Sequence, residues 1–305
     1  MNRWVIYTAI VGGYDEIMQP VVVDNRFDFI LFTNDVKARQ IGVWQVRPID
    51  YDNVIQTKIA RWVKTHPEEL LPEYECSLWI DASVLIKSGF VYERVLELFI
   101  SDVLISTFIN PELTCVYQEV LSMMFLKWET EQTGIEWGAF LRKEGYPRWI
   151  GTNETRMLFR KHADEKVREL DKLWWWCIDN YSRRDQYSFH YVLWKQGMDS
   201  MPFFPEGSDV RHSEHFELVK HSNEQQKQLC GEKDSELMRY YRKHVNERAV
   251  IENVYYWIYG RRHPFFWLGI IGVFFKMKHL VLFYLGRKND IDYEREVKRI
   301  MVNGK

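Results

Sequence analysis

The sequence predicts an α/β protein, with a central sheet flanked by helices and a helical C-terminal extension. Two observations lead to this class. Strand-like and helix-like segments alternate through the first half of the chain, which is the pattern of a sheet covered by helices. After His221 a polar stretch precedes a final apolar segment. We therefore expect a folded domain over residues 1–221, a helical connector over 222–260 and a third segment over 261–305.

Strands are expected where apolar runs are bounded by turn residues. They cover Trp4 to Val11, Phe27 to Thr33, Val43 to Arg47, Ser77 to Asp81 and Val103 to Thr107. Apolar residues at helical spacing predict helices near Val54 to Lys64, Gly89 to Phe99, Asp164 to Asp179 and Arg184 to Gln196. Residues 113–146 are expected to be mainly helical, and a further strand is expected within 148–160.

Asp81 is the first candidate functional residue, because it ends the apolar strand SLWID. A carboxylate at the end of a buried strand is costly unless a metal ion, a charge or hydrogen bonds meet it. In open α/β sheets this edge is also where ligands bind. Asp81, Ala82 and Ser83 are interpreted as a shortened Asp-x-Asp element, which would hold a divalent cation against a sugar-nucleotide diphosphate. The alternative is an aspartate that only begins a turn before Ser83.

The helix expected over residues 54–64 carries three cations at a spacing of three, opposite an apolar arc: Lys58, Arg61 and Lys64. Such a ridge could neutralise a diphosphate, and an arginine could bind it through two hydrogen bonds. The alternative is an ordinary solvated helix face. His66-Pro67 is expected to end the helix, because the residue before a proline disfavours helical backbone angles.

The loop after the first strand, Gly12-Gly13-Tyr14, is not a dinucleotide-binding turn of the G-x-G-x-x-G type. Its glycines would let the backbone approach a ligand closely, and Tyr14 could stack on a nucleobase. A simple turn explains the same residues equally well.

Residues 182–190, SRRDQYSFH, place Asp185 and Gln186 at the start of an expected helix. Ser182 and Asp185 have the spacing of a capping box, in which Asp185 would bind only backbone N–H groups. Alternatively, the carboxylate and the amide face a substrate, helped by the positive end of the helix dipole. The preceding run Trp174-Trp175-Trp176 cannot share one helix face, so at least one ring is expected to face solvent or a sugar, unless the rings only pack.

Composition excludes several classes of protein. The chain has 41 Lys and Arg against 43 Asp and Glu, so its formal net charge of -2 argues against a nucleic-acid-binding protein. Four widely spaced cysteines without a C-x-x-C pair indicate neither a zinc ribbon nor a dense disulfide framework, and favour a reducing, cytoplasmic compartment. The apolar run at the N-terminus is too short for a signal peptide.

The final apolar segment begins at Arg261, and its uncharged run covers only Pro264 to Phe275. That run is much shorter than the roughly 20 apolar residues that cross a bilayer. Basic residues on both sides could meet anionic headgroups, so we favour a helix that lies in the plane of a membrane surface. A buried hairpin, a homodimer interface and a tilted or re-entrant span are the alternatives.

In their order along residues 4–221, the motifs of this chain resemble those of one family: Val5-Ile6-Tyr7-Thr8-Ala9-Ile10, FILFTND, K-x-x-R-x-x-K-x-H-P, SLWIDAS, CVYQE, RKH, SRRDQYSFHYVLWKQG and a final histidine. It is the glycosyltransferase-like family long catalogued as a domain of unknown function, with plant mucilage and bacterial capsule or lipopolysaccharide members. The resemblance implies a GT-A type fold. In this fold a Rossmann-like nucleotide-binding sheet merges with an acceptor-binding half, often with a divalent metal ion.

The resemblance also implies roles for individual residues. Asp81 matches the W-I-D element and is expected to contact the metal ion or the diphosphate, with His221 as a further metal ligand. The expected donor-binding residues are Thr8, Tyr14, Lys58, Arg61 and Lys64, and the expected catalytic residues are Asp185 and Gln186 of R-D-Q and Glu119 of C-V-Y-x-E. Ala82-Ser83 and Asn110-Pro111 depart from the family pattern, which weakens the expectation of strict metal dependence and could alter acceptor choice. The R-D-Q motif is similar to the Asp-Gln pair of some retaining galactosyltransferases and favours retention.

The sequence therefore predicts a hexosyl- or related transferase. It would move a sugar from a nucleotide-diphosphate donor to a surface polysaccharide or lipid-linked glycan, with Mn²⁺ or Mg²⁺ as cofactor, at the inner face of the cell membrane. Asp185, or else Glu119, would orient or deprotonate the acceptor hydroxyl, or stabilise positive charge on the sugar. The alternatives are a sugar-nucleotide hydrolase or pyrophosphorylase, and a catalytically inactive nucleotide-sugar- or glycan-binding scaffold at the membrane.

Overall fold

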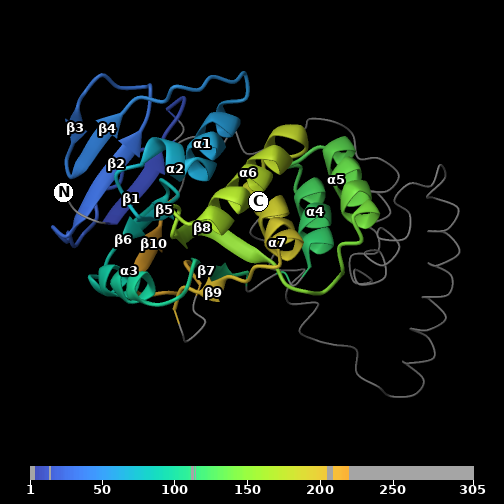
Figure 1. Cartoon of the computed structure of the whole chain (residues 1–305). Helices are drawn as coiled ribbons and strands as arrows, with labels where there is room; N and C mark the ends of the chain where they lie inside the picture. The colour runs from blue at the N-terminus through green and yellow to red at the C-terminus, as the bar shows by residue number, and fades with distance from the viewer. Residues whose placement is uncertain (1–3, 14, 111–112, 114, 205–208, 220–305) are drawn as a thin grey trace, which may run out of the picture. The chain divides into compact units, whose positions relative to one another are not determined.

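The computed structural model describes residues 4–13, 15–110, 113, 115–204 and 209–219 (Figure 1). The chain divides into two compact units. The first comprises Met1–Pro111 and Gly151–Gln226, and the second comprises Glu112–Ile150 and Lys227–Lys305. The connector and the C-terminal segment expected from the sequence lie outside the described residues.

The first unit is built on a mixed sheet of eight strands, in the order β3-β4-β2-β1-β5-β8-β7-β9. Its strands are β1 (Trp4–Ala9), β2 (Phe27–Phe32), β3 (Gln40–Ile41), β4 (Trp44–Arg47), β5 (Cys76–Ile80), β7 (Ile105–Ile109), β8 (Asn153–Arg160) and β9 (Met201–Pro202). Strands β4, β2, β1 and β5 are parallel, whereas β8 runs antiparallel to both β5 and β7. Two further strands, β6 (Val84–Ile86) and β10 (Phe216–Leu218), pair in a small sheet of their own.

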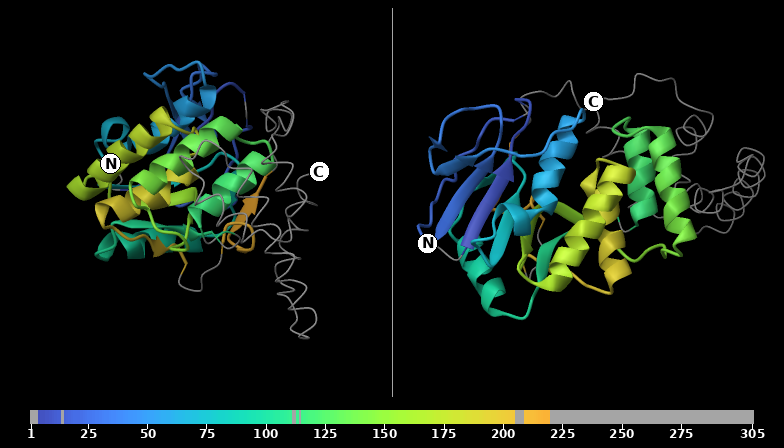
Figure 2. Two further views of the ribbon diagram at one scale, coloured as in Figure 1. Left: turned by 90° about the vertical axis from the view of Figure 1, so that its right-hand side faces the viewer. Right: turned by 45° about the horizontal axis from the view of Figure 1, so that its top comes forward.

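Helices cover both faces of the eight-stranded sheet (Figures 1 and 2). Because side chains alternate along a strand, Ile6 and Leu78 share one face, where they pack with α3 (Phe90–Ile100) in the main apolar core. Tyr7 and Trp79 lie on the other face, toward α1 (Gln56–Thr65). Helices α6 (Glu165–Asn180) and α7 (Asp185–Gln196) follow β8 and cover this second face, and a short helix, α2 (Pro67–Leu70), follows α1.

The described part of the second unit contains α4 (Val116–Phe125) and α5 (Glu131–Lys143). Thr130 caps α5, since its side-chain oxygen accepts a hydrogen bond from the N–H of Thr133 at 3.0 Å. Gly134 brings the two helices close together, because a Cβ added there would lie 2.3 Å from the sulfur of Met124. These two helices are the helical region expected over residues 113–146.

The mixed α/β class is confirmed, and each expected strand and helix is found with its ends shifted by a few residues. The largest shift is in β8, which begins at Asn153 rather than near Arg148. Strand β7 begins two residues late, at Ile105, after a turn in which the N–H of Val103 donates to Ser101 Oγ. The sequence analysis missed β3, β6, β9 and β10, because strands of two or three residues show no periodicity.

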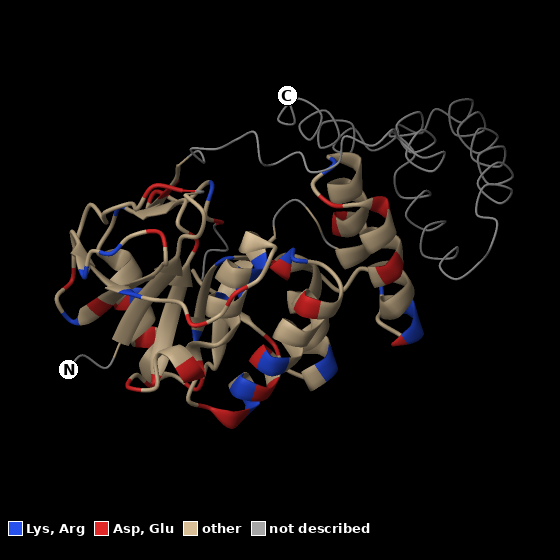
Figure 3. Cartoon of the chain, turned by 90° about the horizontal axis from the view of Figure 1, so that it is seen from above, with Lys and Arg blue, Asp and Glu red and all other residues tan. Residues whose placement is uncertain are grey.

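The distribution of charge and the character of the helices can be compared with what the sequence predicts. Acidic and basic residues are interspersed over its helices and loops (Figure 3), as a formal net charge of -2 leads us to expect. Among the described helices, none combines the length and the apolar character that a bilayer crossing requires.

Candidate active site

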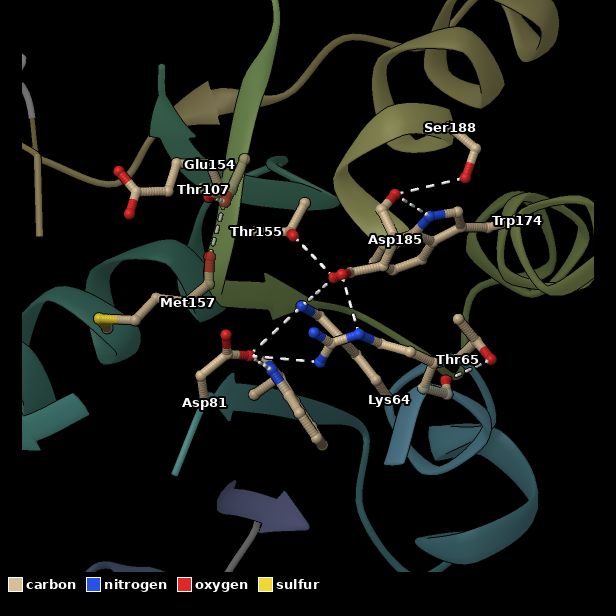
Figure 4. A network of polar contacts seen from close by, with 12 residues as sticks. Lys64, Thr65, Asp81, Thr107, Glu154, Thr155, Met157, Trp174, Asp185 and Ser188 are labelled. Atoms are coloured by element: carbon tan, nitrogen blue, oxygen red, sulfur yellow. Dashed lines mark hydrogen bonds and ion pairs between the residues drawn. The ribbon is translucent and has the colours of Figure 1, made fainter. Parts of the chain in front are cut away.

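Asp81 lies at the C-terminal end of β5, a strand whose five residues are all buried. Its backbone N–H donates to the carbonyl of Arg156 on β8 at 2.8 Å, and its own carbonyl accepts the N–H of Val84 at 2.9 Å. The side chain faces α1, where Oδ1 accepts the indole N–H of Trp79 at 2.7 Å and lies 3.5 Å from Lys64 Nζ (Figure 4). Asp81 therefore begins a turn with its backbone while its carboxylate meets a cluster of charges.

Asp185 is the second carboxylate of this cluster. Its Oδ2 accepts hydrogen bonds from Lys64 Nζ at 2.5 Å and from the hydroxyl of Thr155 at 2.8 Å, and its Oδ1 lies 2.9 Å from Arg61 Nε (Figure 4). The capping-box alternative is wrong, because α7 has no side-chain cap at its N-terminus. Ser182 Oγ instead accepts the N–H of Arg184, and the carboxylate of Asp185 points at cations.

Lys64 joins the two carboxylates, since its ammonium group contacts both. Its side chain is completely buried and lies over the rings of Trp79 and Trp174, at 5.4 and 5.7 Å from the ring centroids. The prediction of one basic ridge on this helix is therefore wrong. Only Arg61 is partly exposed beside the carboxylates, at 22%, while Lys58 binds Asp179 at the end of α6. The last turn of α1 packs on the sheet, and this packing encloses Lys64.

The charges of the cluster balance and set the ionisation of Asp185. Burial alone would raise the pKa of Asp185, but Arg61, Lys64 and the hydroxyl of Thr155 hold it well below its usual range. A carboxylate with so low a pKa is a weak base at neutral pH. Asp185 is therefore suited to electrostatic stabilisation and orientation rather than to proton abstraction.

A bulge in β8 explains how Thr155 reaches this cluster. The pairing of β7 with β8 is regular up to Thr107 and Leu158, and then Phe108 pairs with Glu154. Residues 155–157 of β8 therefore have no partner on β7. The hydroxyl of Thr107 spans this gap, because it lies 2.7 Å from the carbonyl of Glu154 and 2.6 Å from that of Met157 (Figure 4). Bulges re-aim side chains, and here the bulge turns Thr155 toward Asp185.

Thr8 and Gln186 make no hydrogen bond or ion pair with this cluster. Thr8 is buried on the Ile6 face of β1, opposite Tyr7, and its hydroxyl has no hydrogen-bond partner within the described residues. Gln186 is partly exposed next to Asp185, and its amide makes no hydrogen bond with the described part of the chain. Glu119 is buried in α4 of the second unit. Tyr14 and His221 lie outside the described residues.

Among the residues that the structure describes, the site offers a divalent cation one protein ligand, the carboxylate of Asp81. All contacts described for Asp81 involve Oδ1, and its Oδ2 takes part in none of them. Within the described residues, no group of three or more His, Cys, Asp or Glu side chains could hold a metal ion. The residues fit a Mg²⁺-type ion in one way, in which a single carboxylate binds it and substrate phosphates and water complete its shell.

Sequence reasoning missed Trp79 and Thr155. Trp79 precedes Asp81 by two residues on the same strand, so the alternation of side chains placed both on one face and could have indicated the contact. Thr155 gave no such signal, because regular alternation carries no information about a bulge. The expectation for the tryptophan run is confirmed: Trp174 is fully buried, while Trp176 is 44% exposed.

Comparison with known proteins shows the class of this chain. The family model described as TOD1/MUCI70, glycosyltransferase-like domain, matches residues 1–221. The chain therefore carries a glycosyltransferase-like domain, as its motifs predict. It belongs to the TOD1/MUCI70 glycosyltransferase-like family. None of the curated proteins matches it significantly.

Similar solved structures include two glycosyltransferases. One is the WbbM bifunctional glycosyltransferase in its apo form, with 10% identity and a TM-score of 0.39 over 67% of this chain. The chain spans 38% of the length of that protein. The other is a glycosyltransferase involved in the glycosylation of the major capsid of PBCV-1, with 14% identity and a TM-score of 0.29, over 52% of this chain and 66% of that one.

Proposed function

We propose that this glycosyltransferase moves a hexosyl or related sugar from a nucleotide-diphosphate donor to a surface polysaccharide or lipid-linked glycan. The observation that carries the proposal is the convergence of Asp81 and Asp185 on Lys64 and Arg61, at the C-terminal end of β5. This edge of parallel strands is where α/β sheets bind nucleotides. Asp81 and Arg61 are the partly exposed members, so they would meet the diphosphate of the donor, while the completely buried Lys64 holds Asp81 from beneath.

A divalent cation, Mn²⁺ or Mg²⁺, would bind at Oδ2 of Asp81, and we retain His221 as a proposed second ligand. When bound, such an ion would neutralise charge on the leaving diphosphate. Arg61 would supply the chain's own share of that stabilisation, since preorganised charge next to a leaving group is often the largest catalytic contribution. Lys58 and Thr8 remain weaker proposals for donor contacts, because Lys58 is bound to Asp179 and Thr8 is buried.

Asp185 and Gln186 would act on the transferred sugar. The ionised Asp185 would stabilise positive charge that develops on the sugar ring, and the amide of Gln186 would donate to or accept from a sugar hydroxyl. This assignment favours a retaining reaction, in which a protein carboxylate near the sugar serves as a charge stabiliser. Glu119 remains the proposed alternative for activating the acceptor.

The enzyme would work at the inner face of the cell membrane, held there by residues 261–305; the alternative is that this segment forms a homodimer interface instead. Support for this proposal comes from the sequence, where an apolar run is flanked by basic residues.

A two-stage experiment tests the function. Thermal unfolding is first measured with UDP-, GDP- and dTDP-sugars, with and without Mn²⁺, and the sugars that stabilise the protein are then tested for transfer to glycan acceptors. We expect stabilisation by one nucleotide class and release of the nucleoside diphosphate that depends on an acceptor. Release that is equal without acceptor would favour a hydrolase, and binding without turnover would favour the inactive scaffold.

A further inference from the structure

Beneath the candidate site lies a second polar cluster, the inner cluster, composed of Tyr7, Arg160 and Asp171. Its side chains come from β1, β8 and α6, and all three residues are completely buried. None of them takes part in the proposed reaction. Their position at the end of α1 nevertheless connects them to the site.

The inner cluster binds the backbone of Lys64. One guanidinium nitrogen of Arg160 pairs with Asp171 Oδ1 at 2.5 Å, and another donates to the Lys64 carbonyl at 2.5 Å and also to the hydroxyl of Tyr7. The hydroxyl of Tyr7 donates to the same carbonyl at 3.0 Å. The last carbonyls of a helix have no partner within it, so the inner cluster caps α1 at the residue whose side chain enters the site.

The inner cluster places an ion pair in the interior of the fold. Burial raises the pKa of Asp171 to about 7, and the neighbouring Arg160 offsets only part of that rise. Within the described residues, Asp171 Oδ2 and Arg160 Nε have no hydrogen-bond partner. Replacing a buried ion pair by apolar residues of similar volume is often neutral or stabilising. Apolar residues could therefore fill this space, so the feature to explain is the pair of hydrogen bonds that Arg160 and Tyr7 donate to the Lys64 carbonyl.

We propose that Tyr7, Arg160 and Asp171 are positioning residues, which fix the backbone of Lys64 so that its ammonium group stays between Asp81 and Asp185. A lysine side chain is flexible, with a mobile ammonium at the end of four methylene groups. If its backbone is free to shift, the ammonium loses one or the other carboxylate. An effect of these residues on turnover rests on the proposed function. Their effect on the pKa of Asp185, through the position of Lys64, does not.

Trp174 extends the same support to the second carboxylate. Its indole N–H donates to the backbone carbonyl of Asp185 at 2.9 Å, and its ring lies 5.9 Å from the Arg160 guanidinium as well as close to Lys64 Nζ. One buried ring thus contacts the inner cluster, the ammonium group and the start of α7.

Two variants and a control test the proposal. The double variant Arg160→Met/Asp171→Leu removes the ion pair without changing net charge, and Tyr7→Phe removes one hydroxyl. Tyr74→Phe is the matched control, because its buried ring also donates one hydrogen bond, to Asp28 at 2.8 Å, away from the site. In protein labelled with ¹³C-aspartate, the titration of Asp185 is followed by NMR and assigned with Asp185→Asn.

The charges that lower the pKa of Asp185 are Arg61 and Lys64, and the inner cluster binds the backbone of Lys64, so a change in the inner cluster reaches these charges through Lys64. We expect the pKa of Asp185 to rise by about one unit or more in the double variant and by less in Tyr7→Phe, with no change in Tyr74→Phe. The double variant should lose about 1.4 kcal/mol of stability for each unit by which the pKa of Asp185 rises, and no more than that. If the double variant does not fold, Tyr7→Phe decides. An Asp185 titration that matches the Tyr74→Phe control would overturn the proposal.

A measurement of turnover tells apart a failure of the positioning role and a failure of the proposed function. Release of nucleoside diphosphate is measured from UDP-glucose, UDP-galactose, UDP-N-acetylglucosamine and GDP-mannose. Where the parent turns over one of them, we expect kcat to fall about tenfold or more in the double variant while the donor KM changes little. A shifted Asp185 titration in a protein that turns over none of these sugars would support the positioning role and count against the proposed function.

Discussion

At the scale of single residues, the site consists of two carboxylates and two cations that compensate one another. Lys64 touches both carboxylates, Arg61 binds Asp185 at 2.9 Å and lies 4.0 Å from Asp81, and the indole of Trp79 adds a hydrogen bond to Asp81. Paired charges can be buried where single ones cannot. Removing one member therefore affects both the chemistry of the site and the stability of the fold.

The ionisation of Asp185 leads to a pH prediction. Its pKa is lower in the folded protein than in the unfolded chain, so the stability that it contributes is present above the unfolded pKa, about 3.9, and is lost as the pH falls through the folded pKa. We expect Asp185→Asn to lower the free energy of unfolding by about 3 to 5 kcal/mol at pH 7, because Lys64 loses its closest partner.

Urea unfolding at a series of pH values measures this difference. The gap between parent and Asp185→Asn should narrow as the pH falls below about 4. A gap that is constant from neutral to acid pH would show that the carboxylate charge of Asp185 does not stabilise the fold.

At the scale of elements, the bulge in β8 and the end of α1 bring the site together. In a regular strand, side chains point alternately to the two faces of the sheet. The bulge in β8 breaks this alternation and directs the hydroxyl of Thr155 to Asp185 Oδ2. The end of α1 brings Lys64 to the same carboxylate oxygen. The site thus depends on a local irregularity as much as on the regular sheet.

The bulge gives the second prediction. Thr155→Val keeps the shape of the side chain but removes the donor to Asp185, whereas Thr155→Ser keeps the donor. We expect Thr155→Val to destabilise the fold by about 1 kcal/mol and to lower the turnover number about tenfold, with Thr155→Ser near the parent in turnover. Calorimetry and steady-state kinetics measure the two effects. Equal loss of turnover in both variants would contradict the prediction, because the Ser variant keeps the hydroxyl donor to Asp185.

The sequence predicted the regular parts of this site but not its irregular parts. Asp81 was found because a polar residue after a buried strand stands out against the apolar pattern. The burial of Lys64 could not be found, because a lysine at helical spacing with two other cations has the pattern of a solvated face. The contacts of Thr155 and of Arg160 depend on a bulge and on tertiary packing, which leave no periodic signal in the sequence.

At the scale of the whole molecule, the family match covers residues 1–221 and leaves the C-terminal segment unexplained. The sequence predicts that residues 261–305 bind an acidic membrane surface through inserted aromatic side chains and flanking cations. That prediction is independent of the chemistry of the site, so the two can be tested separately.

Deletion of residues 261–305 is the third prediction. The shortened protein should no longer sediment with vesicles that contain phosphatidylserine, and it should keep its affinity for the donor. The full chain should bind such vesicles less strongly at high salt, because salt screens the electrostatic part of the attraction. Failure of the full chain to bind vesicles, or unfolding of the shortened protein, would favour the dimer or the buried hairpin.

The central claim is that the carboxylate of Asp81 belongs to the donor site of a glycosyltransferase. The variant Asp81→Asn keeps the volume of the side chain and loses its charge. Asp164→Asn is the matched control, because Asp164 is the N-cap of α6 and asparagine caps a helix as well as aspartate does. The measurement is the rate of sugar transfer at saturating donor, with the fold of each variant checked by calorimetry. The claim predicts that Asp81→Asn loses about 100-fold or more in rate while Asp164→Asn equals the parent. A folded Asp81→Asn protein with the parent's transfer rate would contradict it.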